Sequence, residues 1–166
     1  MNAIQSLKTL TSLFPDTLIS NPVGEPVVSA IAVGAPASEV WKVVGDFGGF
    51  TQFIPALASI EVIGTGQGSV RYKRFKEGGL VVVEQLNSRD DDAMFMTWTT
   101  LYNNLGVSRL WASMTVVPRD EASCVATWTI IAEPMNDNSM SADDFKAFLQ
   151  GFADGAMNNV PLLFGQ

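Results

Sequence analysis

One carboxylate, Glu84, has the surroundings in this sequence that best fit a chemical role. It lies in the apolar run 80–88, where strand alternation puts it on one face with Leu80, Val82 and Leu86. This face is the more apolar of the two, so we expect it to point inward. A lone buried carboxylate is costly as an anion, so Glu84 should pair with a cation or keep its proton. The nearest cations are Arg71 and Lys73 on the preceding predicted strand.

Two interpretations of Glu84 are open. One is an ion pair with a purely structural role inside the fold. The other is a group that anchors a ligand or moves protons. In the second case Tyr72 and Tyr102 accompany Glu84 as candidate catalytic residues, because a phenol can carry a proton.

The absence of histidine excludes whole classes of chemistry. The chain has no His and one cysteine, Cys124. It therefore lacks the usual general base, the Ser-His and Cys-His nucleophile systems and the commonest metal ligand. We expect neither a metal site nor a bound cofactor. Cys124 lies in an apolar run, which favours a buried, unreactive thiol over a nucleophile.

Charge and composition restrict the partners and the location. The net charge of −7 and the scattered cations argue against nucleic acid. No apolar run reaches the roughly 18 residues of a membrane span, and the N-terminus lacks the features of a secretory signal, so we expect a cytoplasmic protein. Hydrophobic residues make up 47% of the chain and charged residues 16%. This apolar surplus indicates a large interior, a lined cavity or a subunit interface.

The first part of the chain divides at a cluster of helix-breaking residues. Residues 1–24 show apolar residues at roughly helical spacing before Pro22, Gly24 and Pro26, which predicts a helical arm packed on the domain. A strand follows over 27–33. Pro36 and Glu39 then predict the first turn of a helix, which Gly48-Gly49 ends.

Strands dominate the rest of the chain. Alternating patterns separated by turns predict strands over 58–63, 69–76, 80–88, 93–102, 108–117 and 122–132. The short connections point to antiparallel hairpins. Ser141 or Ser139 is the expected N-cap of a last amphipathic helix, whose apolar stripe includes Phe148 and Phe152. A sheet followed by one covering helix is an α+β architecture.

Four short motifs occur in a recognisable order. They are Val40-Trp41 with Val44, Asp46 and Phe47, then Phe53-Ile54-Pro55, then Gly66-Gln67-Gly68 leading to Arg71, then the strand 82–86 around Glu84. Over residues 27–164 this order resembles the START-like superfamily (SRPBCC, the birch-pollen-allergen fold), notably its bacterial polyketide cyclase/dehydrase and lipid-transport branch. The segment 84–100 also resembles the plant abscisic-acid receptors.

The resemblance implies a helix-grip fold over residues 25–166. This is a curved seven-stranded antiparallel sheet wrapped round a long C-terminal helix, with two short helices after the first strand. Hydrophobicity alone would turn Val70 and Tyr72 inward, whereas the resemblance turns Arg71, Lys73 and Phe75 inward. We follow the resemblance, because it also supplies Glu84 with a counterion.

The resemblance further implies a cavity between the sheet and the last helix. Its expected ligand-binding residues are Arg71, Lys73, Phe75, Val82, Glu84, Met96, Trp98, Thr100, Trp111, Ser113, Thr127, Phe148 and Phe152. Met and Trp suit an adaptable apolar wall, and a few hydroxyls supply polar contacts. For each aromatic residue here, ordinary core packing is the alternative.

These observations predict a protein that binds a hydrophobic or amphipathic small molecule, such as a polyketide, lipid, terpenoid or aromatic metabolite. A cofactor-independent polyketide cyclase/dehydratase or aromatase is the first alternative, with Glu84 moving protons. A protein-interaction or assembly factor with an incidental cavity is the second. The faces of the later strands opposite the predicted cavity are apolar too, which fits a homodimer or cover by the N-terminal arm.

Overall fold

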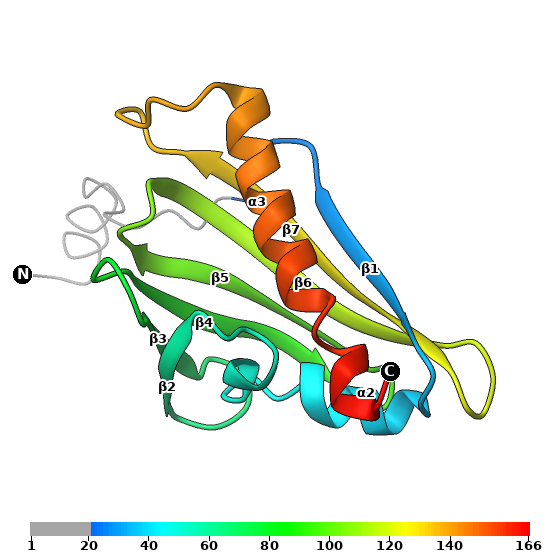
Figure 1. The fold of residues 1–166 in the computed structure, drawn as a ribbon. Coiled ribbons are helices and arrows are strands. Elements are labelled where there is room, and N and C mark those ends of the chain that lie inside the picture. Colours follow the sequence, from blue (N-terminus) through cyan, green and yellow to red (C-terminus); the bar gives the residue numbers. More distant parts are fainter. Residues whose placement is uncertain (1–20) are drawn as a thin grey trace, which may run out of the picture.

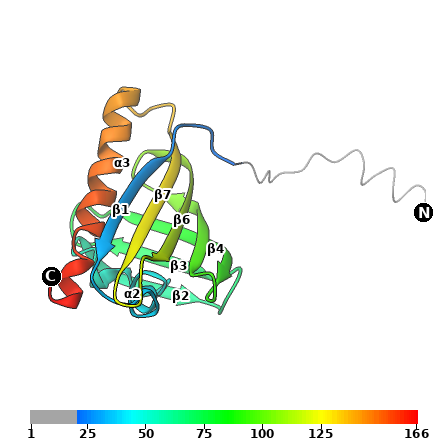
Figure 2. The ribbon, with the colours of Figure 1, turned by 90° about the vertical axis from the view of Figure 1, so that its right-hand side faces the viewer.

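The computed structural model describes residues 21–166, which form one antiparallel sheet with a long helix along one of its faces (Figure 1). As far as residue 20, the predicted N-terminal arm lies outside the described residues. Residues 21–24 form no helix. Turned by a quarter circle, the molecule shows the helix α3 beside β1 and β7, against which it packs (Figure 2).

The sheet has seven strands in the order β1-β7-β6-β5-β4-β3-β2. Their bounds are β1 Val27–Val33, β2 Leu57–Ile63, β3 Val70–Phe75, β4 Val81–Asp90, β5 Phe95–Asn103, β6 Val107–Pro118 and β7 Cys124–Pro134. From β2 to β7 each strand pairs with the next one in the chain, and β1 pairs with β7. The fold class predicted from the sequence is confirmed.

Two short helical segments connect β1 to β2 across one end of the sheet (Figure 1). The first, α2 (Ala37–Val44), starts after Pro36 and buries Val40, Trp41 and Val44. Gly45 ends it under the Trp41 indole, where an added Cβ would lie 2.5 Å from two ring carbons. The second is the 3-10 turn η1 (Phe50–Gln52), which buries Phe50.

The long helix α3 (Ala142–Met157) is held at its start by a side-chain cap. The Ser141 hydroxyl accepts a hydrogen bond from the Asp144 backbone N–H at 3.1 Å, as expected of an N-cap serine. The 3-10 turn η2 (Pro161–Phe164) follows near the C-terminus. Within residues 21–166 no helix combines the length and hydropathy needed to cross a bilayer.

Aromatic rings fill the half of the interior near α2 and η1. Phe50 lies 4.7 Å from Phe53, 5.7 Å from Trp98 and 5.9 Å from Trp128 between ring centroids. All four rings are buried. Two members of this cluster, Trp98 and Trp128, also line the space beneath the middle of α3.

Candidate functional site

Three charged side chains meet inside the fold. Arg71 on β3 lies directly opposite Glu84 on β4, and its Nε donates to Glu84 Oε2 at 2.7 Å. Lys73 Nζ lies 3.1 Å from the same oxygen. The exposed fractions of Arg71, Lys73 and Glu84 are only 0%, 3% and 3%. The pairing and the inward register predicted for these residues are therefore present.

Arg71 is enclosed by aromatic faces. Its guanidinium carbon lies 4.2 Å from the Phe47 ring centroid, 4.1 Å from that of Phe50 and 4.8 Å from that of Trp98. Its Nη1 donates to the Phe47 carbonyl at 2.9 Å. Rings in this position attract a desolvated cation. Arg71 is thus fixed within the core, on the side of Glu84 that faces α2 and η1.

Burial changes the acidity of the cluster. Burial lowers the pKa of Lys73 to about 8, although Glu84 opposes the change, and nearby Arg71 lowers it further. Burial likewise lowers the pKa of Arg71, against the attraction of Glu84. Burial alone would raise the pKa of Glu84, but the two cations together hold it below its usual range. At neutral pH Glu84 is therefore an anion, and Lys73 lies close to its titration point.

A cavity of about 230 Å³ opens between the sheet and the middle of α3. Lys73 and Glu84 lie in its wall, and among the described residues the other polar side chains there, apart from the two indoles, are Thr100 and Asn103. Eight of the predicted ligand-binding residues line it, namely Lys73, Phe75, Val82, Glu84, Trp98, Thr100, Phe148 and Phe152. The site is thus a largely apolar cavity with the Lys73–Glu84 ion pair on one side.

Two buried residues predicted for the site do not reach the cavity. Arg71 lies behind Glu84, among the aromatic rings. Met96 is fully buried, and its sulfur lies 3.6 Å from Arg89 Nη1. Both belong to the core beside the cavity, and Trp98, which packs on Arg71, is the ring that also lines the cavity.

The predicted register of β6 and β7 is wrong. Leu110 and Ala112 on β6, with Trp128 and Ile130 on β7, line the cavity. Trp111, Ser113 and Thr127 therefore lie on the opposite face, since successive strand residues alternate. Both faces of these strands carry apolar residues, so hydrophobicity did not decide the register. The hydroxyls of Ser113, Thr115, Thr127 and Thr129 were the signal, because they share the outer face.

The two candidate catalytic tyrosines lie on the outer face of the sheet. Tyr72 pairs with Val83, and Val83 pairs with Tyr102, so both phenols are on the face opposite to Glu84. Tyr102 is 59% exposed. A β-bulge causes this, because Glu84 pairs with Thr100 while Val83 pairs with Tyr102. Leu101 is the extra residue, and it moves Tyr102 off the face that it would share with Trp98 and Thr100 in a regular strand.

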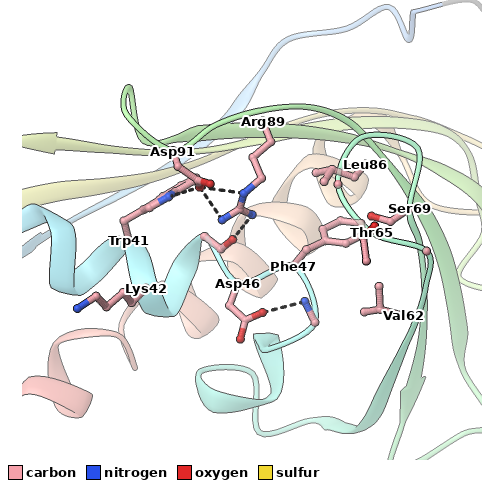
Figure 3. A pocket seen from close by; sticks show the side chains of 14 residues that line it. Trp41, Lys42, Asp46, Phe47, Val62, Thr65, Ser69, Leu86, Arg89 and Asp91 are labelled. Atoms are coloured by element: carbon pink, nitrogen blue, oxygen red, sulfur yellow. Dashed lines mark hydrogen bonds and ion pairs between the residues drawn. The ribbon is translucent and has the colours of Figure 1, made fainter.

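A second hollow, an open groove of about 790 Å³, lies beside α2 (Figure 3). Asp91 Oδ1 accepts hydrogen bonds from Trp41 Nε1 and Arg89 Nε, each at 2.9 Å. Arg89 Nη1 also donates to the Gly45 carbonyl. These contacts tie α2 to the end of β4 and leave Arg89 and Asp91 paired with each other. The groove is larger than the cavity but more open to solvent, so the more enclosed cavity is the better ligand site.

The turn 64–68 borders this groove and not the cavity. Gly64, Gly66 and Gly68 all have positive φ, as a tight hairpin turn requires. A strand follows the turn, whereas a phosphate-binding loop would need a helix there. The loop is a hairpin connection, as the sequence indicated.

The sequence and the fold both have relatives among known proteins. Residues 26–160 match a protein family described as polyketide cyclase/dehydrase and lipid transport. An uncharacterised protein from Bacillus thuringiensis has a similar structure, with a TM-score of 0.76 and 15% identity over 86% of this chain and 100% of that chain. No curated protein matches this sequence.

Two other solved structures share the fold. The Zhui aromatase/cyclase from Streptomyces sp. R1128 gives a TM-score of 0.65 at 18% identity, over 82% of this chain and 91% of that chain. Ara h 8.0201 gives 0.60 at 16% identity, over 82% of this chain and 97% of that chain. At such identities these likenesses establish the fold alone.

Proposed function

This chain belongs to the polyketide cyclase/dehydrase and lipid transport family, and from that premise we propose that it binds a small apolar or amphipathic molecule in the cavity between the sheet and α3. The observation that carries the proposal is a largely apolar cavity with the Lys73–Glu84 ion pair in its wall. Sites for small molecules commonly combine an apolar lining with a few polar groups that orient the ligand.

The size of the cavity limits the ligand. A dry cavity of about 150 Å³ holds benzene, and this one has about 230 Å³. A ring system of one or two rings or a short chain fits this volume, which favours aromatic metabolites and small terpenoids. A longer lipid or polyketide would extend past Phe148, which lines the cavity yet is 41% exposed.

Lys73 and Glu84 supply the polar anchor in this proposal. A carbonyl, hydroxyl or carboxylate of the ligand would accept a hydrogen bond from Lys73 Nζ, which lies in the cavity wall. The apolar part of the ligand would pack on Trp98, Trp128 and Phe152. Since Tyr72 and Tyr102 lie on the outer face, the tyrosine-assisted cyclase alternative loses two of its proton carriers, and binding is the function that the geometry supports best.

Two adjacent residues of β6 provide a matched test. Ala112 lines the cavity, and Ser113 points the other way. In Ala112→Leu the larger side chain occupies the cavity, so calorimetric titration with 2-naphthol should show affinity lower by about tenfold or more. Ser113→Leu should leave the affinity unchanged. Equal affinity in wild type and Ala112→Leu, or no binding by wild type, would contradict the proposal.

Native mass spectrometry of the purified protein gives an independent test. We expect a copurifying molecule with the mass of a small aromatic or terpenoid compound. Its occupancy should fall in Ala112→Leu and persist in Ser113→Leu. A protein that is always empty under gentle conditions counts against the proposal.

We propose in addition that the outer face of the sheet mediates self-association. The large apolar side chains of Val28, Leu101 and Val117 are each at least 50% exposed on strands β1, β5 and β6. Light scattering should then give the mass of a dimer, and Leu101→Lys should convert it to a monomer. A monomeric wild type would leave this apolar face without a partner copy.

A further inference from the structure

Lys73 combines three properties that rarely occur together. Among the described residues that line the cavity, it has the only amine. Its side chain is 4% exposed, so bulk water barely reaches the nitrogen. Its neighbours are one carboxylate, Glu84, at 3.1 Å, and one further cation, Arg71, on the same carboxylate.

The geometry points to covalent chemistry at this nitrogen. Building on the proposed binding function, we propose that Lys73 forms an imine with a ketone or aldehyde group of the ligand in the cavity. A lysine becomes a carbonyl nucleophile when it is desolvated or lies next to another cation. Lys73 meets both conditions, through its burial and through Arg71.

The protonation of Lys73 supports this chemistry. Only an unprotonated amine attacks a carbonyl carbon. The pKa of Lys73 is lowered to about 8, mainly by burial, so about a tenth of the protein carries the free amine at pH 7, against less than about one part in a thousand for an ordinary lysine. The exposed Lys42 and Lys146, each in a surface ion pair, lack this desolvation.

The reaction balances within the site. Nζ adds to the carbonyl carbon, and the C–N bond forms while the carbonyl oxygen takes a proton. Glu84, 3.1 Å from the nitrogen, can pass protons from nitrogen to oxygen. The C–O bond then breaks and the oxygen leaves as water, so that amine and ketone become imine and water. Protonation of the imine restores the positive charge that Glu84 already faces.

The cavity restricts which carbonyl compounds can react. About 230 Å³ of apolar space accommodates a ketone with one ring or a short chain, with its carbonyl directed at Lys73. Sugars and other highly hydroxylated aldehydes would leave their hydroxyls without partners in this wall. The expected substrate class is therefore an apolar monoketone or aldehyde.

Reductive trapping tests the proposal. Full-length protein is incubated with 4-phenylbutan-2-one and sodium cyanoborohydride, which adds hydride to the imine carbon and makes the bond permanent. Peptide mapping by mass spectrometry should find the ketone-derived group on Lys73, with labelling of Lys42 and Lys146 slower by roughly tenfold or more. Lys73→Arg keeps the charge but should abolish the cavity adduct, and Ala112→Leu should slow it.

The outcomes separate this inference from the proposed function. An unmodified Lys73, or labelling no faster there than on Lys42 and Lys146, overturns the imine whether or not Lys73→Arg folds. If 2-naphthol still binds in that case, the binding function stands without the covalent step. If labelling of Lys73 persists undiminished in Ala112→Leu, the reaction does not use the cavity and the inference also fails.

Discussion

The cluster of Arg71, Lys73 and Glu84 holds two cations on one carboxylate, with almost no exposed surface. A buried charge without a partner is costly. Arg71 reduces this cost through the aromatic rings around it, and Lys73 reduces it by losing its proton more easily. Neither of these effects replaces Glu84, because Glu84 is the counterion that both cations share.

We expect Glu84→Gln to lower the free energy of unfolding by about 3–5 kcal/mol, since Arg71 would stay buried without an anion and Lys73 would have to give up its proton on folding. Urea denaturation followed by tryptophan fluorescence measures this change. The matched control is Glu25→Gln, because Glu25 lies 2.7 Å from Lys146, the same distance as in the Arg71–Glu84 pair, but is 83% exposed. A similar loss in both variants would show that burial is not what makes Glu84 important.

The lowered pKa of Lys73 predicts a particular pH dependence of stability. In the unfolded chain Lys73 titrates near 10.5, whereas in the folded protein it titrates at about 8. Between these values the unfolded state holds the extra proton, so the stability contributed at this site rises with pH. Below the pKa of Lys73 in the folded protein, burial of the protonated amine lowers the free energy of unfolding by its full amount, on the order of 3 kcal/mol.

The difference in unfolding free energy between wild type and Lys73→Met isolates this effect. The free energy of unfolding of the wild type should rise relative to that of the variant as pH rises from 8 to 10.5, because only the wild type can release the buried proton. Both proteins share every other titrating group. A constant difference across this range would mean that Lys73 titrates as an ordinary surface lysine.

Among the secondary-structure elements, the presence of each strand was predicted better from the sequence than which of its faces points inward. The alternation around Glu84 is asymmetric, with an apolar face and a mixed face, so its inward direction could be predicted. β6 and β7 have apolar residues on both faces, and the choice between Trp111 and Ala112 depended on packing against α3 and the aromatic core. The bulge at Leu101 carries no glycine or proline that would mark it, so the sequence did not show that Tyr102 lies on the face opposite to Glu84.

Two glycines at helices have opposite expected responses to alanine. At Gly45 an added Cβ would lie 2.5 Å from the Trp41 ring, which would have to shift and weaken its hydrogen bond to Asp91. We expect Gly45→Ala to destabilise the protein by about 1–3 kcal/mol. In α3, an added Cβ at Gly151 meets nothing within 4 Å, so Gly151→Ala should stabilise by about 0.5–1 kcal/mol.

Thermal and urea unfolding of the two glycine variants checks these signs. Loss of the Trp41 contact should also change the near-ultraviolet circular dichroism of Gly45→Ala and leave that of Gly151→Ala unaltered. Stabilisation by Gly45→Ala would contradict the close packing of Trp41 on the end of α2.

For the whole molecule, the strand order and the covering helix followed from the hairpin connections and the resemblance. The extent of the cavity did not follow from the sequence, because the cavity is the space that is left after the rings of Phe50, Phe53, Trp98 and Trp128 have packed. Rotamers of large rings decide that remainder, and no sequence pattern records them. The resemblance therefore predicted a cavity between the sheet and the last helix, but not that Arg71 and Met96 would lie outside its wall.

Ligand binding should stabilise the whole fold, because the cavity exists only when the sheet and α3 are assembled. With 2-naphthol at a hundred times its dissociation constant, the unfolding free energy should rise by about 2.7 kcal/mol. Differential scanning calorimetry should record a higher Tm in wild type and Ser113→Leu. In Ala112→Leu, where the affinity is at least tenfold lower, the rise at the same concentration should be about 1.4 kcal/mol or less, and a rise equal to that of wild type would place the binding elsewhere.

The extra positive charge beside the cavity should affect the choice of metabolites that the protein retains from a cell extract. An alkaloid or aryl-alkyl amine would bring a second ammonium toward Lys73 and lose its hydration with no free carboxylate to meet it. Arenes bearing a keto, phenolic or acid group face no such repulsion. Compounds of equal shape and hydrophobicity would thus differ in affinity according to the charge of their head group.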